Sequence, residues 1–284
     1  MLISEILQNF SHIIPDRLYL VLKYHKRYGK YPDLKRPTTF TEKLQWIKLH
    51  DRRPLYTTLV DKYEVKKYVA ERLGEEHIIP LIGVWDDVDE INFDALPNQF
   101  VMKCTHDSGG LVICKDKSQF DVEAAKKKIK DVLNKNFYWV SREWPYKNVK
   151  PRVIVEQYMQ DTKTGELRDY KFFTFNGVPK VMYIASGRGT GETYGDFFDM
   201  DFNHLDMQID HKTAPITPQK PQTFETMKRA AEKLAKGIPQ VRVDFYEIDG
   251  EFYFGEMTFF HCGGFERFHP EILDKTWGEW VDLP

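Results

Sequence analysis

The stretch VRVDFYEIDGEFYFGEMTF, residues 241–259, alternates as the two strands of a β-hairpin do, yet it carries charged residues among aromatic and branched apolar ones. They are Arg242, Asp244 and Glu256. A two-residue turn followed by a regular ladder would place Glu256 on the apolar face, where a lone carboxylate is costly to bury. We therefore expect a different register.

A three-residue loop over 249–251, with Gly250 in the left-handed conformation and a bulge, shifts the pairing by one residue. Asp244 then lies opposite Glu256, and Arg242 lies opposite Thr258. Carboxylates directly across an antiparallel ladder have Cβ atoms about 4.5–5.5 Å apart and repel each other. A divalent cation relieves this repulsion, and oxygen ligands suit Mg²⁺ or Mn²⁺ completed by phosphates and water.

The alternative is a solvated outer face that carries unrelated charges. Tyr246, Phe252 and Phe254 are poor surface residues, so their presence favours the metal interpretation. Arg242 on the same face would complement phosphate charge as a bidentate fork.

The elements that must position this hairpin alternate between helices and paired strands. Residues 1–96 have mainly helical patterns, including a capping box at Thr39 and Glu42. Strands are predicted at 99–104, 111–115, 152–159 and on both sides of the Asn176-Gly177 turn, with helices at 121–135 and 223–236. Strands joined by tight turns predict an α+β fold built from antiparallel sheets. We divide the chain into regions 1–96, 97–159 and 160–284.

Composition excludes several classes of protein. The 284 residues include 41 Lys plus Arg and 43 Asp plus Glu, a formal charge of -2, which argues against a dedicated nucleic-acid surface. The three cysteines, Cys104, Cys114 and Cys262, show no metal-binding or disulfide spacing and suit a reducing cytoplasm. No transmembrane segment is expected, and the basic end of the 13–30 segment leaves peripheral membrane contact open as an alternative to a docked surface helix.

The order of several short motifs resembles the TupA-like ATP-grasp family, which is associated with bacterial surface polysaccharide synthesis. The motifs are PTTFTEKLQWIK, VDKYEVKKYV, LPNQFVMKCTHDSGG, VIVEQYM, DYKFFTFNG, VRVDFY, FGEMTF and GGFERF. The resemblance implies an ATP-grasp fold, in which two antiparallel-sheet subdomains grip the nucleotide behind a helical N-terminal region. It also implies ATP and Mg²⁺, with Mn²⁺ as an alternative ion.

The resemblance assigns roles to individual residues. It implies that Lys103 contacts the nucleotide phosphates and that a mobile loop, His106 to Gly110, closes over them. That loop includes Ser108 and Gly109. Adenine would be bound by Glu156, Gln157, Tyr158 and Met159, ribose by Asp169, and Lys62 would be a further nucleotide contact. The metal ligands would be Asp244, Glu256 and Thr258, although many relatives have asparagine at the position of Thr258.

The implied reaction is ligation of a carboxylate to an amine through an acyl phosphate. The expected acid is a uronic acid of a capsular or cell-wall polysaccharide or its precursor, and the amine is an amino acid or small amino alcohol. Arg188, within a glycine-rich loop, is the candidate for binding the substrate carboxylate. His261 and His269 are either bases for the amine or structural residues.

Two other functions remain open. The triplet DMD at 199–201 could bind the metal and nucleotide sugar of a glycosyltransferase, or Asp199 could simply cap a turn. The chain could also be a binding module without catalysis that keeps an ATP-grasp fold.

Overall fold

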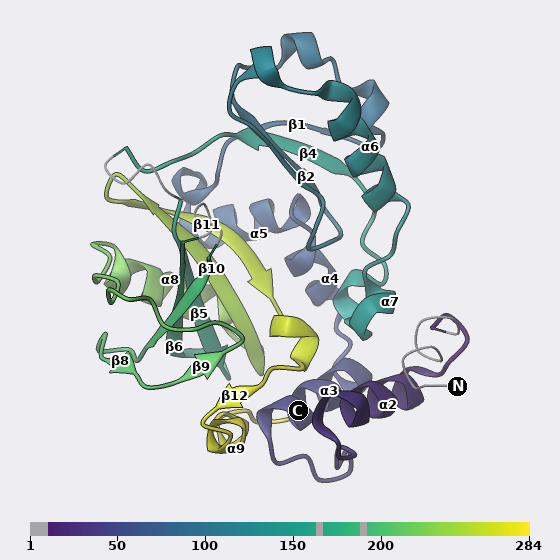
Figure 1. Ribbon diagram of the computed structural model, residues 1–284, viewed down its shortest axis with the longest axis vertical. Coiled ribbons are helices and arrows are strands. Elements are labelled where there is room, and N and C mark those ends of the chain that lie inside the picture. The colour runs from purple at the N-terminus through teal and green to yellow at the C-terminus, as the bar shows by residue number, and fades with distance from the viewer. Residues whose placement is uncertain (1–10, 163–166, 188–191) are drawn as a thin grey trace.

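The computed structural model describes residues 11–162, 167–187 and 192–284, and within them two antiparallel sheets have separate hydrophobic cores. Figure 1 shows the smaller sheet at the top and the larger one below it. The α+β class predicted from the sequence is confirmed.

The smaller sheet has four strands and is covered by one helix. Its strand order is β1 (Leu81–Trp85), β4 (Val153–Gln157), β2 (Phe100–Cys104), β3 (Leu111–Cys114). Helix α6 (Val122–Leu133) packs on β2 and β3, and Asp121 caps it by accepting a hydrogen bond from the Ala124 amide. The first strand comes from the range that the sequence analysis assigned to the helical region, so this sheet begins before residue 97.

The larger sheet has six strands. Their order is β11 (Glu251–Thr258), β10 (Gln240–Ile248), β5 (Asp169–Phe175), β6 (Val178–Ser186), β7 (Tyr194–Phe198), β8 (His204–Leu205). Helix α8 (Phe224–Ala235) packs against β5, β6 and β10 (Figure 1). Asn176 and Gly177 have φ values of 51° and 83°, as the tight turn predicted between β5 and β6 requires.

The remaining elements surround these sheets. The other helices are α2 (Asp16–Tyr28), α3 (Phe40–His50), α4 (Pro54–Val60), α5 (Glu64–Leu73), α7 (Tyr138–Ser141) and α9 (Ile272–Glu279). Single 3₁₀ turns occur at Glu75–His77, Val88–Glu90, Phe93–Ala95, Lys117–Gln119, Trp144–Tyr146 and His261–Gly264, and β9 (Gln208–Ile209) pairs with β12 (Phe268–His269). The predicted capping box of Thr39 and Glu42 is present at the start of α3. Across the described residues we find no helix that is both long and apolar enough to cross a membrane.

The hairpin of β10 and β11 has the predicted pairing at its charged end but a different turn. Arg242 pairs with Thr258 and Asp244 with Glu256, as expected. The loop, however, has two residues, because Ile248 pairs with Glu251, and Asp249 and Gly250 both have positive φ. The prediction of a three-residue loop is therefore wrong. That loop with a regular ladder would also place Phe245 opposite Gly255, and this pairing does not occur.

A bulge at Gly255 supplies the shift instead. The register changes between Asp244 and Phe245, which pairs with Phe254. A Cβ atom on Gly255 would lie 3.1 Å from the carbonyl oxygen of Asp244, so glycine allows the extra residue to fit closely against the neighbouring strand. The bulge brings the two carboxylates to the same face of the sheet.

Candidate active site

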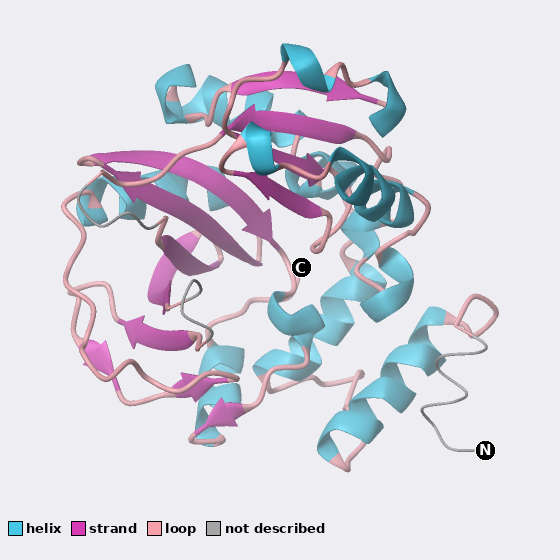
Figure 2. Ribbon diagram, turned by 45° about the horizontal axis from the view of Figure 1, so that its top comes forward, coloured by secondary structure: helices cyan, strands magenta, loops and turns pink. Residues whose placement is uncertain are grey.

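A cleft runs along the face of the larger sheet that carries the charged residues of the hairpin. One part, of about 660 Å³, is lined by the hairpin, the loop after β2 and the segment between α7 and β4. An adjoining part, of about 480 Å³, lies beside the end of β4. The two parts share Lys103, Leu111, Glu156, Asp169 and Tyr246, so they lie side by side. Figure 2 shows the four-stranded sheet and α6 on one side of the six-stranded sheet.

Arg242 and Asp244 form the buried centre of the larger part. The Nε and Nη2 atoms of Arg242 donate to the two carboxylate oxygens of Asp244, at 2.7 and 2.6 Å. Lys171 Nζ also lies 2.5 Å from Asp244 Oδ2, because β5 pairs with β10 at this position. Burial alone would raise the pKa of Asp244, but Arg242 and Lys171 outweigh it and lower the pKa below its ordinary value.

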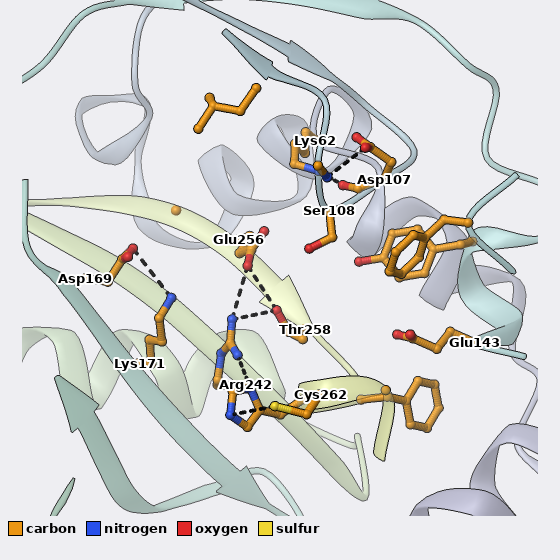
Figure 3. A pocket seen from close by; sticks show the side chains of 18 of the residues that line it. Lys62, Asp107, Ser108, Glu143, Asp169, Lys171, Arg242, Glu256, Thr258 and Cys262 are labelled. Atoms are coloured by element: carbon orange, nitrogen blue, oxygen red, sulfur yellow. Dashed lines mark hydrogen bonds and ion pairs between the residues drawn. The ribbon is translucent and has the colours of Figure 1, made fainter. Parts of the chain in front are cut away.

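Glu256 and Thr258 extend this network toward the open cavity, as Figure 3 shows. Arg242 Nη2 is 3.1 Å from Glu256 Oε1 and 3.0 Å from Thr258 Oγ1. The side chain of Glu256 is 42% exposed, whereas that of Asp244 is 1% exposed. On its other side, Arg242 Nη1 donates to His261 Nδ1 at 2.6 Å, and burial together with Arg242 lowers the pKa of His261 well below its ordinary value. His261 is therefore a neutral acceptor.

The oxygen atoms here have the chemistry of a magnesium site. Asp244, Glu256 and Thr258 present carboxylate and hydroxyl oxygens on one face, as a hard cation requires. Within residues 11–162, 167–187 and 192–284, no group of three or more histidine, cysteine or acidic side chains could hold a metal ion. A metal here would thus rely on two carboxylates and ligands from a substrate, and it would compete for Asp244 with Lys171 and Arg242.

Lys103 lies on the opposite wall and pairs with Glu156 of β4. Its Nζ is 2.6 Å from Glu156 Oε2, and Lys66 Nζ of α5 is 2.5 Å from Oε1. Burial would raise the pKa of Glu156, but Lys103 and Lys66 hold it below its ordinary value. Both predicted nucleotide residues therefore face the cleft as an ion pair.

The loop after β2 directs its amides toward an internal carboxylate. Gly109 N and Gly110 N donate to Asp107 Oδ2 at 2.7 and 2.6 Å, and Lys62 Nζ donates to the carbonyl oxygen of Asp107. Ser108, Gly109 and Gly110 line the cavity with Lys62. Successive amides that hold one carboxylate can hold a phosphate oxygen in the same way.

His106 points elsewhere. It is buried, and its Nε2 contacts the carbonyl oxygens of Val132 and Lys135 at the end of α6, 3.2 and 3.1 Å away. It is absent from the lining of both parts of the cleft. This position is that of a structural residue that fixes the loop to the helix.

The smaller part of the cleft contains the other predicted nucleotide residues. Gln157, Tyr158 and Met159 line it beside apolar side chains from β2, β3 and the segment before β5. Asp169 lines both parts and lies 3.5 Å from Lys171 Nζ. The predicted adenine and ribose contacts thus line one cavity, together with several apolar side chains.

Two further candidates lie away from this cleft, and one lies outside the described residues. His269 lines a separate cavity of about 650 Å³ beside α9. Asp199 accepts hydrogen bonds from the amides of Asp201 and Asn203, at 2.9 and 2.8 Å, and so caps a turn. Neither acid of the DMD triplet lines the cleft, which gives the glycosyltransferase interpretation no site there. Arg188 lies outside the described residues.

Sequence reasoning missed Lys66, Lys171 and Glu143, the last of which also lines the larger part of the cleft. Lys171 left a signal, because it is a lysine in the otherwise apolar strand DYKFFTF, two residues after Asp169 and hence on the same face. Lys66 lies on the surface pattern of a helix, and nothing local distinguishes it. Glu143, in an irregular segment, gave no signal.

Comparison with known proteins gives a family and a set of distant structural likenesses. The family described as TupA-like ATPgrasp matches residues 42–282. D-alanine–D-alanine ligase from Bacillus anthracis, complexed with ATP, is 17% identical with a TM-score of 0.40, over 71% of this chain and 54% of that one. The Helicobacter pylori D-alanine–D-alanine ligase is 16% identical with a TM-score of 0.39, over 79% of this chain and 61% of that one.

D-cycloserine synthetase DcsG gives 17% identity and a TM-score of 0.39, over 72% of this chain and 64% of that one. The chain therefore spans less than two thirds of the length of each of these three solved proteins. No curated protein matches.

Proposed function

Because the chain belongs to the TupA-like ATP-grasp family, matched over residues 42–282, we propose that it is an ATP-dependent ligase that joins a carboxylate to an amine. The proposed acid is a uronic acid of a capsular or cell-wall polysaccharide or of its precursor, following the association of the family. The amine is an amino acid or a small amino alcohol. The reaction passes through an acyl phosphate and releases ADP.

The observation that carries the proposal is the face shared by β10, β11 and β5. There Arg242, Lys171 and two opposed carboxylates meet at a cleft that continues to Lys103. Arg242 bonds both carboxylates and Lys171 bonds Asp244, so the repulsion between the two acids is compensated within the protein. Cations and carboxylates gathered at one cleft suit phosphoryl transfer, because its catalysis depends on positioning and charge neutralisation.

The chain's residues have separate tasks in the two steps. Lys103 and the amides of Gly109 and Gly110 hold phosphate oxygens, while Arg242 faces the transferred phosphoryl group. A substrate carboxylate oxygen attacks the γ-phosphorus, and ADP leaves with the bridging oxygen. A divalent ion held by Asp244 and Glu256, with Thr258 beside them, would neutralise charge that develops on the phosphates.

In the second step the amine nitrogen attacks the acyl carbon, inorganic phosphate leaves, and the nitrogen loses a proton. The acyl phosphate must be kept from water, and closure of the 106–110 loop would serve this purpose. Gln157, Tyr158 and Met159 would contact adenine and Asp169 the ribose. The three free cysteines and the need for ATP suit the cytoplasm.

Thermal unfolding with Mg-ATP tests this proposal. At a hundredfold its Kd, a ligand stabilises the folded state by about 2.7 kcal/mol, which is measurable as a rise in Tm. We expect this rise in the wild type, a smaller one in Lys103→Met, and loss of its metal-dependent part in Asp244→Asn. Asp131→Asn, at an exposed position of α6, is the matched control.

Release of ADP is then measured with pairs of uronic acids and amines. If Mg-ATP leaves the wild-type Tm unchanged while manganese complexes of nucleotide sugars raise it, the ligase proposal is wrong. Equal Mg-ATP responses in Asp244→Asn and the wild type would remove Asp244 from the metal site.

A further inference from the structure

Glu143 contributes a carboxylate to the larger part of the cleft and has no role in the proposed function. Glu143 lies between α7 and the 3₁₀ turn Trp144–Tyr146, is 4% exposed, and lines the 660 Å³ cavity. Figure 3 shows its carboxylate directed into the space that Thr258 and Cys262 face from the other side. Within the part of the chain that the structure describes, its carboxylate has no hydrogen bond and no ion pair.

The two lysines whose charge acts on Glu143 donate to other acceptors. Lys48 Nζ donates to the carbonyl oxygen of Gly263 at 2.5 Å and to Gln45 Oε1 at 2.9 Å. Lys23 Nζ donates to the carbonyl oxygen of Val140 and to Ser141 Oγ, at 2.6 and 2.8 Å. Burial raises the pKa of Glu143 to about 7, although Lys48 and Lys23 act to lower it. The carboxylate therefore opens onto the cavity without a direct partner among the described side chains, which leaves its oxygens available to a ligand.

The surroundings of Glu143 suit a small organic cation. Phe137 and Tyr146 line the same cavity, and aromatic faces attract ammonium groups as well as packing against carbon chains. Phe260 also lines it, but Lys48 Nζ already lies 5.2 Å from the centre of that ring. A primary ammonium group offers three N–H donors, which matches a carboxylate with free lone pairs. The backbone passes close by at Gly263, where a Cβ atom would lie 3.6 Å from Glu143 Oε1 and 2.6 Å from Ser141 Oγ.

The charges along the cavity also restrict the rest of that ligand. Among the described residues that line it, the lysines and arginine are Lys62, Lys66, Lys103, Lys171 and Arg242, each of which already bonds or pairs with another group of the protein. Next to Glu143 the lining includes Ser141 and Gly263, while Lys23 and Lys48, which act on the charge of Glu143, are not part of the lining and donate to Ser141 Oγ and to the Gly263 carbonyl oxygen. A carboxylate attached to the amine would meet Glu143 without a lining cation beside it, and this repulsion is unfavourable in a buried site.

We propose that Glu143 binds the ammonium group of the amine substrate, and that this substrate is a small primary amine without a carboxylate. The inference rests on the proposed ligase function and deepens it, because it chooses an amino alcohol or a similar amine over an amino acid. Glu143 is then a substrate-binding residue that acts at the second step.

Ligand-observed NMR titration of the full chain, saturated with Mg-AMPPNP, tests the inference. The probes are ethanolamine, glycine and ethylene glycol, which differ in one functional group each. We expect ethanolamine to bind the wild type about tenfold or more tightly than glycine or ethylene glycol, since only ethanolamine has the ammonium group without a carboxylate. Glu143→Gln should lose this preference, and Glu71→Gln, on an exposed part of α5, should keep it.

The nucleotide separates the two proposals. If Mg-AMPPNP does not bind the wild type, the ligase proposal fails and this inference fails with it. If Mg-AMPPNP binds but ethanolamine does not, or glycine binds as tightly, or Glu143→Gln keeps the preference, only this inference is overturned. The comparison of the three probes in the wild type remains decisive if Glu143→Gln does not fold.

Discussion

Replacing Gly255 by valine tests whether the bulge in β11 sets the geometry of the active site. At an ordinary strand position, glycine to valine is stabilising by up to about 1 kcal/mol, because β-branched residues suit strands. At Gly255 a Cβ atom would lie 3.1 Å from the Asp244 carbonyl oxygen and 3.2 Å from Tyr246 Cε2. The first of these is a backbone atom, so it cannot move aside independently.

Gly255→Val should therefore destabilise the folded protein, whereas the same substitution at an ordinary strand position would stabilise it. Overpacking of this kind costs about 1–3 kcal/mol. With a shift of about 2–4 °C per kcal/mol, we expect the Tm of Gly255→Val to fall by roughly 2–12 °C. Movement of the strand would also separate Glu256 from Arg242, which are now 3.1 Å apart, so we expect weaker Mg-ATP binding by calorimetry.

Gly83→Val in β1 is the matched control. The added Cβ would meet the outer end of the Trp85 ring at 2.2 Å, and a side chain can rotate away where a carbonyl cannot. We expect the Tm of Gly83→Val to change less than that of Gly255→Val, with unchanged Mg-ATP affinity. A Gly255→Val protein with a wild-type or higher Tm and full Mg-ATP affinity would refute the argument from the bulge.

Two further predictions concern stability. Asn176 has a φ of 51° and donates to the Trp280 carbonyl and to Asp282 Oδ2, both at 2.9 Å. Asn176→Ala should therefore lower the free energy of unfolding, measured in urea, by about 1–3 kcal/mol. Asn176→Gly should lower it by less, because glycine adopts a positive φ without strain. Burial raises the pKa of Glu266 from 4.5 to about 8. The folded state then binds the extra proton between these values, so unfolding free energy should fall as pH rises across that window. Thermal unfolding against pH should show a flatter profile for Glu266→Gln, and an unchanged profile would contradict the shift.

The sequence was sufficient to pair Asp244 with Glu256, because the alternative buried a lone carboxylate. It did not locate the bulge. Asp249-Gly250 can form a two-residue or a longer loop, and Gly255 has no local feature that distinguishes it from an ordinary strand glycine. The cost of burying a lone carboxylate therefore predicted on which face of the hairpin each charged residue lies. The length of the turn and the position of the bulge depend on backbone conformations that the residue types do not determine.

Other differences come from contacts between distant segments. Lys171 meets Asp244 only because β5 is the neighbour of β10, and the order of strands in a sheet is not encoded by either strand alone. His106 belongs to a loop whose glycines line the cleft, yet its ring contacts α6. Adjacent residues in a turn face different directions, so a motif predicts the loop better than each side chain within it.

Hydrogen bonds and ion pairs within the cleft explain how the folded protein can hold so many cationic side chains close together. Lys171 and Arg242 share Asp244, Lys66 and Lys103 share Glu156, and the amides of Gly109 and Gly110 share Asp107. Under the proposed function, phosphate oxygens would compete with these carboxylates for the same donors. Under the proposed function, phosphates that take these donors leave carboxylates without partners, and a divalent ion compensates that loss at Asp244 and Glu256. Nucleotide and metal would then favour each other's binding because each restores the charge balance that the other disturbs.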